Sequence, residues 1–132
     1  MDNEALIAVL VAGPILVYLL IWFASRPKLD RQVVSRQWLK AKSLLNGNEP
    51  QFAIIEADKI FDSVLRQLDF KGANMGARLK NAQSSIDNIN QVWVAHKLRN
   101  QLVHEPDAKV SKKQAQTALA SFEKALKGLG VL

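Results

Sequence analysis

The sequence predicts an all-α protein: a single N-terminal transmembrane helix followed by a small cytosolic bundle of about four main helices. Two observations carry this prediction. Residues 5–24 form an uncharged, apolar run, and after residue 30 the apolar residues recur every three or four positions, which is the spacing of one helix face. No segment alternates apolar and polar residues as a half-buried strand does. With 132 residues, the chain has room for the membrane segment and one small domain.

The first element is a transmembrane helix over residues 5–24, within an anchor of residues 1–25. Its twenty residues would span about 30 Å as a helix, the thickness of the hydrocarbon core of a bilayer. Aromatic residues gather at its C-terminal end, as they do at the level of the lipid headgroups: Tyr18, Trp22 and Phe23. A signal peptide would carry basic residues before the apolar run, whereas acidic residues precede this one.

A basic segment follows the anchor and sets its orientation. Residues 26–42 hold six basic side chains and one acidic side chain. Because Lys and Arg are enriched in cytoplasmic flanks, we expect the N-terminus outside and the C-terminal domain in the cytoplasm, at the cell (inner) membrane. The basic side chains can also contact anionic lipid headgroups, and the candidates for this membrane surface are Arg26, Lys28, Arg31, Arg36 and Lys40. A solvated face that only reinforces topology is the alternative.

The composition also narrows the functional classes. There is no cysteine, which excludes disulfides, thiolate metal sites and a cysteine nucleophile. Two histidines do not supply the three or four ligands of a metal site, and no phosphate-binding loop is present, so we expect no metal and no cofactor. Of the net charge of +6, only +3 falls after residue 42, where twelve basic residues face nine acidic ones. The overall basicity is therefore weak support for nucleic acid, and DNA is not a predicted partner.

Two amphipathic helices come next. Asp30 is placed to cap a helix that ends near Asn46, and its apolar face comprises Val33, Val34, Trp38, Ala41, Leu44 and Leu45. A turn then closes a juxtamembrane segment of residues 26–50. From Gln51 to about Leu68 a second amphipathic pattern indicates a core helix. Its carboxylates lie outside or at the edge of the apolar arc: Glu56, Asp58 and Asp62.

Residues 51–132 are expected to form the rest of the bundle. A short helix should begin near Asn74 and end near Ser85, after a break at Gly72. The last helix should start with a capping box, in which Ser111 and Gln114 bond each other's backbone. Between the short helix and the last helix lies another helix, capped by Asp87 or Asn88.

That helix, around residues 93–105, is the predicted centre of the bundle. Its apolar residues spread over most of the helical wheel, with Leu98 and Leu102 at the middle, so burial on several sides is expected. His96 is interpreted as an interior histidine with satisfied hydrogen bonds, and Trp93 as core. Arg99 falls inside the apolar arc and needs a partner, because an unpaired buried charge is costly. Glu56, Asp58, Asp62 and Glu123 are candidate counter-ions, and a second subunit or an anionic ligand is the alternative.

The run Arg99-Asn100-Gln101-Leu102-Val103-His104 resembles the R-[polar]-x3-H motif of the HEPN superfamily. Members of that superfamily are small all-α bundles that often dimerise with the motif at the interface. Many are metal-independent ribonucleases, and others bind RNA or protein partners without activity. The resemblance implies that Arg99 polarises a scissile phosphate, that His104 is the general acid or base, and that Asn100 orients the pair.

The sequence therefore favours a single-pass membrane-anchored protein whose cytosolic HEPN-like domain, residues 51–132, binds a partner. That partner would be a second copy, giving a homodimer, or RNA. The runner-up is a membrane-tethered metal-independent endoribonuclease using Arg99 and His104. These two residues lie about 140° apart on the wheel, so they converge only if the helix unwinds or a second subunit contributes. A purely structural membrane protein is the third class.

Overall fold

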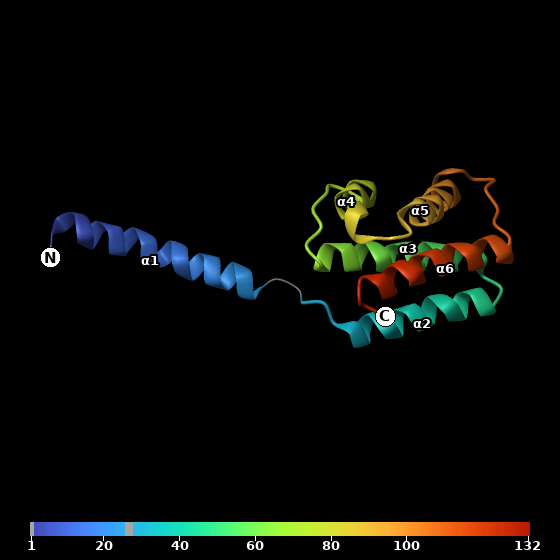
Figure 1. Cartoon of the computed structure of the whole chain (residues 1–132), viewed down its shortest axis with the longest axis horizontal. Coiled ribbons are helices and arrows are strands. Elements are labelled where there is room, and N and C mark those ends of the chain that lie inside the picture. Colours follow the sequence, from blue (N-terminus) through green and yellow to red (C-terminus); the bar gives the residue numbers. More distant parts are fainter. Residues whose placement is uncertain (1, 26–27) are drawn as a thin grey trace.

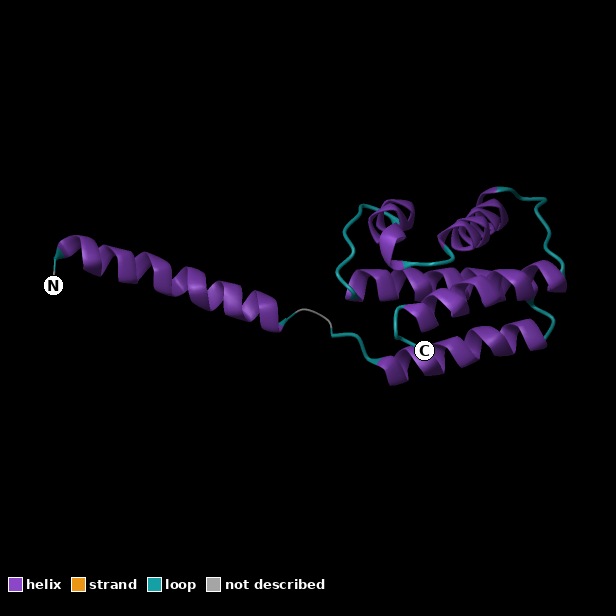
Figure 2. Cartoon of the chain, viewed as in Figure 1, coloured by secondary structure: helices purple, strands orange, loops and turns teal. Residues whose placement is uncertain are grey.

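The computed structural model describes residues 2–25 and 28–132, and these residues contain helices and no strand (Figures 1 and 2). The all-α prediction is confirmed. The elements in chain order are α1 (Asn3–Ala24), α2 (Arg31–Asn46), α3 (Pro50–Gln67), α4 (Met75–Ala82), a short 3-10 helix η1 (Gln83–Ser85), α5 (Ile89–His104) and α6 (Lys112–Gly128).

α1 has the length and composition of a membrane-spanning helix, with a mean hydropathy of 2.6 over its most apolar window. None of its residues is buried, and Figure 1 shows it apart from the other helices. It therefore adds nothing to the core of the helical domain. The predicted span of residues 5–24 lies within it.

α2 begins where the sequence predicts. The Asp30 carboxylate accepts hydrogen bonds from the backbone N–H groups of Gln32 and Val33, at 2.9 and 3.3 Å. Such a cap satisfies donors that the first turn of a helix leaves unpaired. The buried face of α2 packs against α3 and α6, and it comprises Val34, Trp38, Ala41 and Leu45. The helix of the juxtamembrane segment thus shares one core with the helices that follow it.

α3 is the central helix of the bundle. It contacts α2, α4, α5 and α6, and it buries eight residues: Ala53, Ile54, Ala57, Asp58, Ile60, Phe61, Val64 and Leu65. The Phe61 ring lies 5.3 Å from that of Phe122 on α6, between centroids. This distance is typical of packed aromatic pairs.

The prediction that α5 is the central helix was wrong. Only Val92, Ala95 and His96 are buried on α5, whereas Val94 is 68% exposed and Val103 is 48% exposed. Leu98 and Leu102 are half-buried against the edge of the core. The physical reason is that α5 makes extensive contacts with α3 and α6 only. Two neighbours cover only part of its circumference, however widely the apolar residues are spread around the wheel.

The capping box at the start of α6 is confirmed. Ser111 Oγ accepts from the Gln114 backbone N–H at 3.1 Å, and Gln114 Oε1 accepts from the Ser111 N–H at 2.9 Å. At the start of α5, Asn88 occupies the capping position without a side-chain cap. Its amide instead donates to the Ser121 carbonyl at 2.9 Å. Asn88 therefore ties α5 to α6 rather than closing its own helix.

Candidate functional site

A buried hydrogen bond joins α5 to α3. His96 Nδ1 lies 2.8 Å from Asp58 Oδ1, and both side chains are buried. Asp58 occupies an interior position of α3, in the series Ile54, Asp58, Phe61, Leu65 that recurs with helical spacing. A carboxylate in such surroundings must be hydrogen-bonded or paired, because desolvation of an unpaired charge is costly. α5 supplies that partner through His96.

Arg99 lies one turn further along α5 and approaches the same carboxylate. Its Nε is 3.4 Å from Asp58 Oδ2, and this buried atom has no hydrogen-bond partner among the described residues. Its Nη1 donates to Asn100 Oδ1 at 3.0 Å. The Arg99 side chain is 30% exposed. Arg99 is therefore an ion-pair partner of Asp58 that still presents part of its guanidinium to solvent.

The hydrogen bonds among these residues form a chain with one consistent polarity. A guanidinium only donates, so Asn100 accepts through Oδ1 and turns its amide Nδ2 toward His96 Nε2, at 3.3 Å. His96 Nε2 must then accept, which leaves the ring proton on Nδ1 to be donated to Asp58. His96 thus completes the network. We call Asp58, His96, Arg99 and Asn100 the polar network.

A second ion pair fixes α4 beside this network. Arg78 Nε and Nη2 donate to the two carboxylate oxygens of Asp62 on α3, at 2.6 and 3.1 Å. Arg78 Nη1 also donates to the Gly72 carbonyl at 2.6 Å. Such a two-pronged pair combines charge with fixed geometry. It holds the short helix α4 against the end of α3.

The two ion pairs line one groove of about 670 Å³ between α3, α4 and α5, which we call the polar groove. Its cations are Lys59, Arg78, Lys97 and Arg99, and its carboxylates are Asp58 and Asp62, an excess of two positive charges. Trp93 lines the same groove, with its ring centroid 6.0 Å from that of His96. A mildly positive groove with one aromatic wall can accept an anionic ligand.

The structure brings together only part of the site that the sequence singles out. Arg99 and Asn100 lie in the polar groove, but His104 does not line it. His104 is the exposed last residue of α5. None of the side-chain hydrogen bonds or ion pairs of the described residues involves it. The histidine next to Arg99 is His96.

The counter-ion of Arg99 is Asp58. Glu56, which lies beside Ile60 on the helical wheel, instead has its Oε2 3.9 Å from Lys59 Nζ. Glu123 Oε1 accepts hydrogen bonds from Lys42 Nζ and Trp38 Nε1, at 3.1 and 3.0 Å. Sequence reasoning left the choice among these carboxylates open. Asp58 lies at the edge of the apolar arc of α3, next to Leu65 on the helical wheel, and the structure buries it.

Of the predicted membrane-surface residues, Arg31, Arg36 and Lys40 lie on α2 and Lys28 lies just before it. Lys28, Arg31, Arg36 and Lys40 are exposed, whereas Arg26 lies outside the described residues. Exposure leaves these four side chains available to headgroups or to solvent. Among the described residues no cluster of three or more His, Cys, Asp or Glu side chains could hold a metal ion.

In comparisons with protein-family models, curated proteins and solved structures, nothing matches this chain. The resemblance to the HEPN superfamily therefore depends on the motif at Arg99, Asn100 and His104.

Proposed function

We propose that this chain is a single-pass membrane-anchored protein whose cytosolic helical domain binds a partner and does not catalyse a reaction. The membrane part of the proposal is supported by the apolar, fully exposed α1 and by the basic residues after it. With that charge distribution the N-terminus lies outside and the helical domain in the cytoplasm.

The polar network is the observation that favours binding over catalysis. A general acid or base must reach the reacting proton, directly or through one water. Both ring nitrogens of His96 are occupied, by Asp58 and Asn100, and His104 does not line the polar groove. His96 and Arg99 thus tie α5 to α3 through Asp58, and no histidine in the groove is free for proton transfer.

A membrane-tethered endoribonuclease is the second candidate. It is favoured by the exposed part of the Arg99 side chain, which shares the polar groove with Lys97, because guanidinium and ammonium groups bind phosphate. A second subunit would then have to bring its own His104 to that phosphate. The resemblance to the HEPN superfamily implies this chemistry, in which the 2′-hydroxyl of RNA is the nucleophile.

Incubation of the purified full chain with single-stranded RNA in a chelator separates the two candidates. We expect no cleavage above the background of a preparation from cells without the protein, and no change in His104→Ala. Lys109→Ala is the control, since Lys109 is an exposed cation in the loop after α5. Metal-independent cleavage that falls by about 100-fold or more in His104→Ala alone, the scale of a lost general acid or base, would show that the protein is an enzyme.

A further inference from the structure

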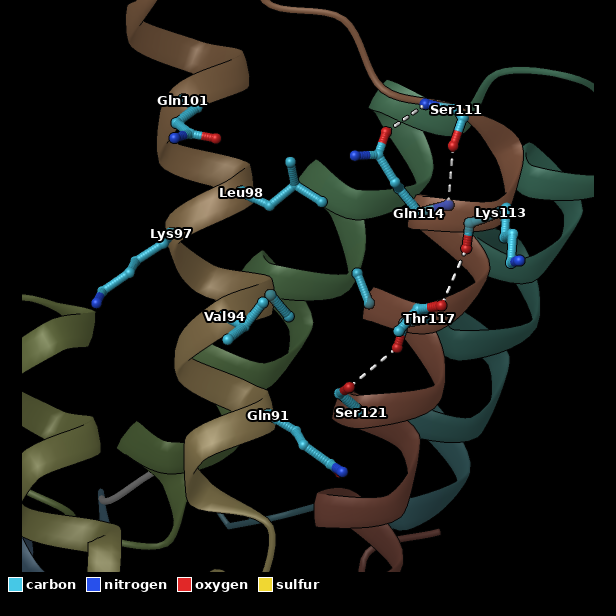
Figure 3. A pocket seen from close by; sticks show the side chains of 12 residues that line it. Gln91, Val94, Lys97, Leu98, Gln101, Ser111, Lys113, Gln114, Thr117 and Ser121 are labelled. Atoms are coloured by element: carbon cyan, nitrogen blue, oxygen red, sulfur yellow. Dashed lines mark hydrogen bonds between the residues drawn. The ribbon is translucent and has the colours of Figure 1, made fainter.

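A second hollow lies on another face of α5, where this helix runs beside α6 (Figure 3). It measures about 490 Å³. A neighbouring hollow of about 340 Å³ shares Gln91, Val94, Thr117 and Ser121 with it. The two hollows form one continuous depression, which we call the α5–α6 groove. On α5 it extends from Gln91 to Gln101, which is about 15 Å or three helical turns.

The floor of the α5–α6 groove is apolar. Val94 is 68% exposed, Leu98 is half-buried, and Figure 3 shows Leu98 pointing from α5 toward α6. On α5 the apolar lining residues are Val94, Ala95 and Leu98, and Gln91 and Gln101 lie at the two ends of this stretch, one turn away from Val94 and Leu98. The groove therefore offers a stripe with the spacing of a helix face.

The α6 wall contributes few free polar groups to this groove. Thr117 Oγ1 donates to the Lys113 carbonyl at 3.1 Å, and Ser121 Oγ donates to the Thr117 carbonyl at 2.9 Å. Gln114 Oε1 is engaged in the capping box, and Figure 3 shows these bonds running along α6. The hydroxyl donors are thus used within α6. A ligand would meet mainly methyl and methylene groups there.

The charged residues around the α5–α6 groove are all lysines. Lys97 and Lys113 line the larger hollow and Lys124 lines the smaller one, and no carboxylate is among the described residues that line either. In Figure 3, Lys97 and Lys113 extend from the outer sides of the two helices, away from the apolar stripe. An apolar floor between positive edges is complementary to an amphipathic helix with acidic flanks.

We propose that the α5–α6 groove binds one amphipathic helix of a different protein, with its apolar stripe on Val94 and Leu98 and its acidic flanks beside the lysines. This inference rests on the proposed function and names the class of partner. A second copy does not fit, because symmetric pairing of the groove would place lysines against lysines. The amphipathic helices α2, α3 and α6 already bury their apolar faces in the core.

A pair of synthetic peptides tests the partner class, with the full chain held in nanodiscs of uncharged lipid. Each helical peptide has about sixteen residues, enough for four turns, with leucines at intervals of three and four. The flanking residues are glutamate in one peptide and lysine in the other. We expect the lysine peptide to bind at least about tenfold more weakly than the glutamate peptide. In the double variant Lys97→Glu/Lys113→Glu, the lysine peptide should be the one that binds more tightly.

Two valine variants locate the binding site. Val94→Glu should weaken binding of the acidic peptide at least about tenfold, because it places a charge on the apolar floor. Val103→Glu is the matched control, since Val103 is an exposed valine of the same helix that lines neither hollow. It should leave binding unchanged. Unaltered circular dichroism of Val94→Glu should show that the fold is intact.

Several results would overturn this inference. The acidic peptide could fail to bind, both peptides could bind equally well, or the two valine variants could have equal effects. A full-chain dimer that dissociates in Val94→Glu would show that a second copy occupies the groove. The proposed function is tested separately, by RNA cleavage. Failed peptide binding without RNA cleavage would therefore refute only the groove.

Discussion

His96 Nδ1 lies 2.8 Å from Asp58 Oδ1 in the interior, at the contact between α5 and α3. Asp58 is the one carboxylate buried among the described residues, and Arg99 reaches it only at 3.4 Å. His96 therefore provides the hydrogen bond that makes this buried charge tolerable. The pair also fixes which face of α5 is turned toward α3.

His96→Ala should lower the free energy of unfolding by about 2 to 4 kcal/mol, because it leaves a buried carboxylate with one distant partner. Urea denaturation of the fragment 28–132 measures this, since α1 contributes no buried residue. His104→Ala, at the exposed end of the same helix, is the control and should change stability by less than about 0.5 kcal/mol. Similar effects of the two variants would contradict the assigned role of His96.

Leu65→Ala on α3 should cost about 2 to 5 kcal/mol, because Leu65 is fully buried and its loss leaves a cavity. The sequence led us to expect Leu98 to be buried as well. Leu98 is only half-buried, so Leu98→Ala should cost about 1 kcal/mol, the scale of partial loss of apolar contact. The same denaturation experiment compares them, and a larger effect at Leu98 would show that α5 is the central helix after all.

The free energy of unfolding should depend on pH through Glu123. Burial raises the pKa of Glu123, but the hydrogen bonds from Lys42 and Trp38, with the charges of Lys42 and Lys127, outweigh this and hold the pKa below its ordinary 4.5. A lowered pKa in the folded state adds stability above the ordinary pKa, and this stability is lost as pH falls through the folded value. Glu123→Gln should therefore be less stable than wild type at pH 7.

The difference between wild type and Glu123→Gln should shrink below about pH 4.5, the ordinary pKa of a glutamate. Urea denaturation across this range measures it. Glu105→Gln, which removes an exposed carboxylate in the loop after α5, is the control and should change stability by less than about 0.5 kcal/mol at pH 7. A difference between wild type and Glu123→Gln that is independent of pH would mean that packing alone explains the effect.

A reporter fused after Leu132 should be active only in the cytoplasm, because the Lys and Arg excess follows α1. Exchange of Lys28, Arg31, Arg36 and Lys40 for glutamine, with lysines added before α1, should move the reporter outside in part of the molecules. The same four exchanges without added lysines are the control for fusion stability. Reporter activity of the unaltered fusion outside the cytoplasm would contradict the predicted orientation and exclude a cytosolic partner.

The sequence by itself determined the local structure of this protein. The Asp30 cap and the Ser111–Gln114 capping box involve groups two or three residues apart, so the chain alone specifies them. The apolar length of α1 and the amphipathic patterns of α2, α3 and α6 are likewise properties of single segments. For the same reason Arg99 could be recognised as a charge in need of a partner before any neighbouring helix was known.

Only the tertiary structure decided which groups meet. A helical wheel gives directions around one axis, but it says nothing of how many neighbouring helices stand in those directions. Asp58 rather than Glu56 therefore faces Arg99, and α3 rather than α5 is surrounded by other helices. The exposure of Val94 follows from the same cause. Contacts between helices depend on their axial shift and crossing angle, which no single segment encodes.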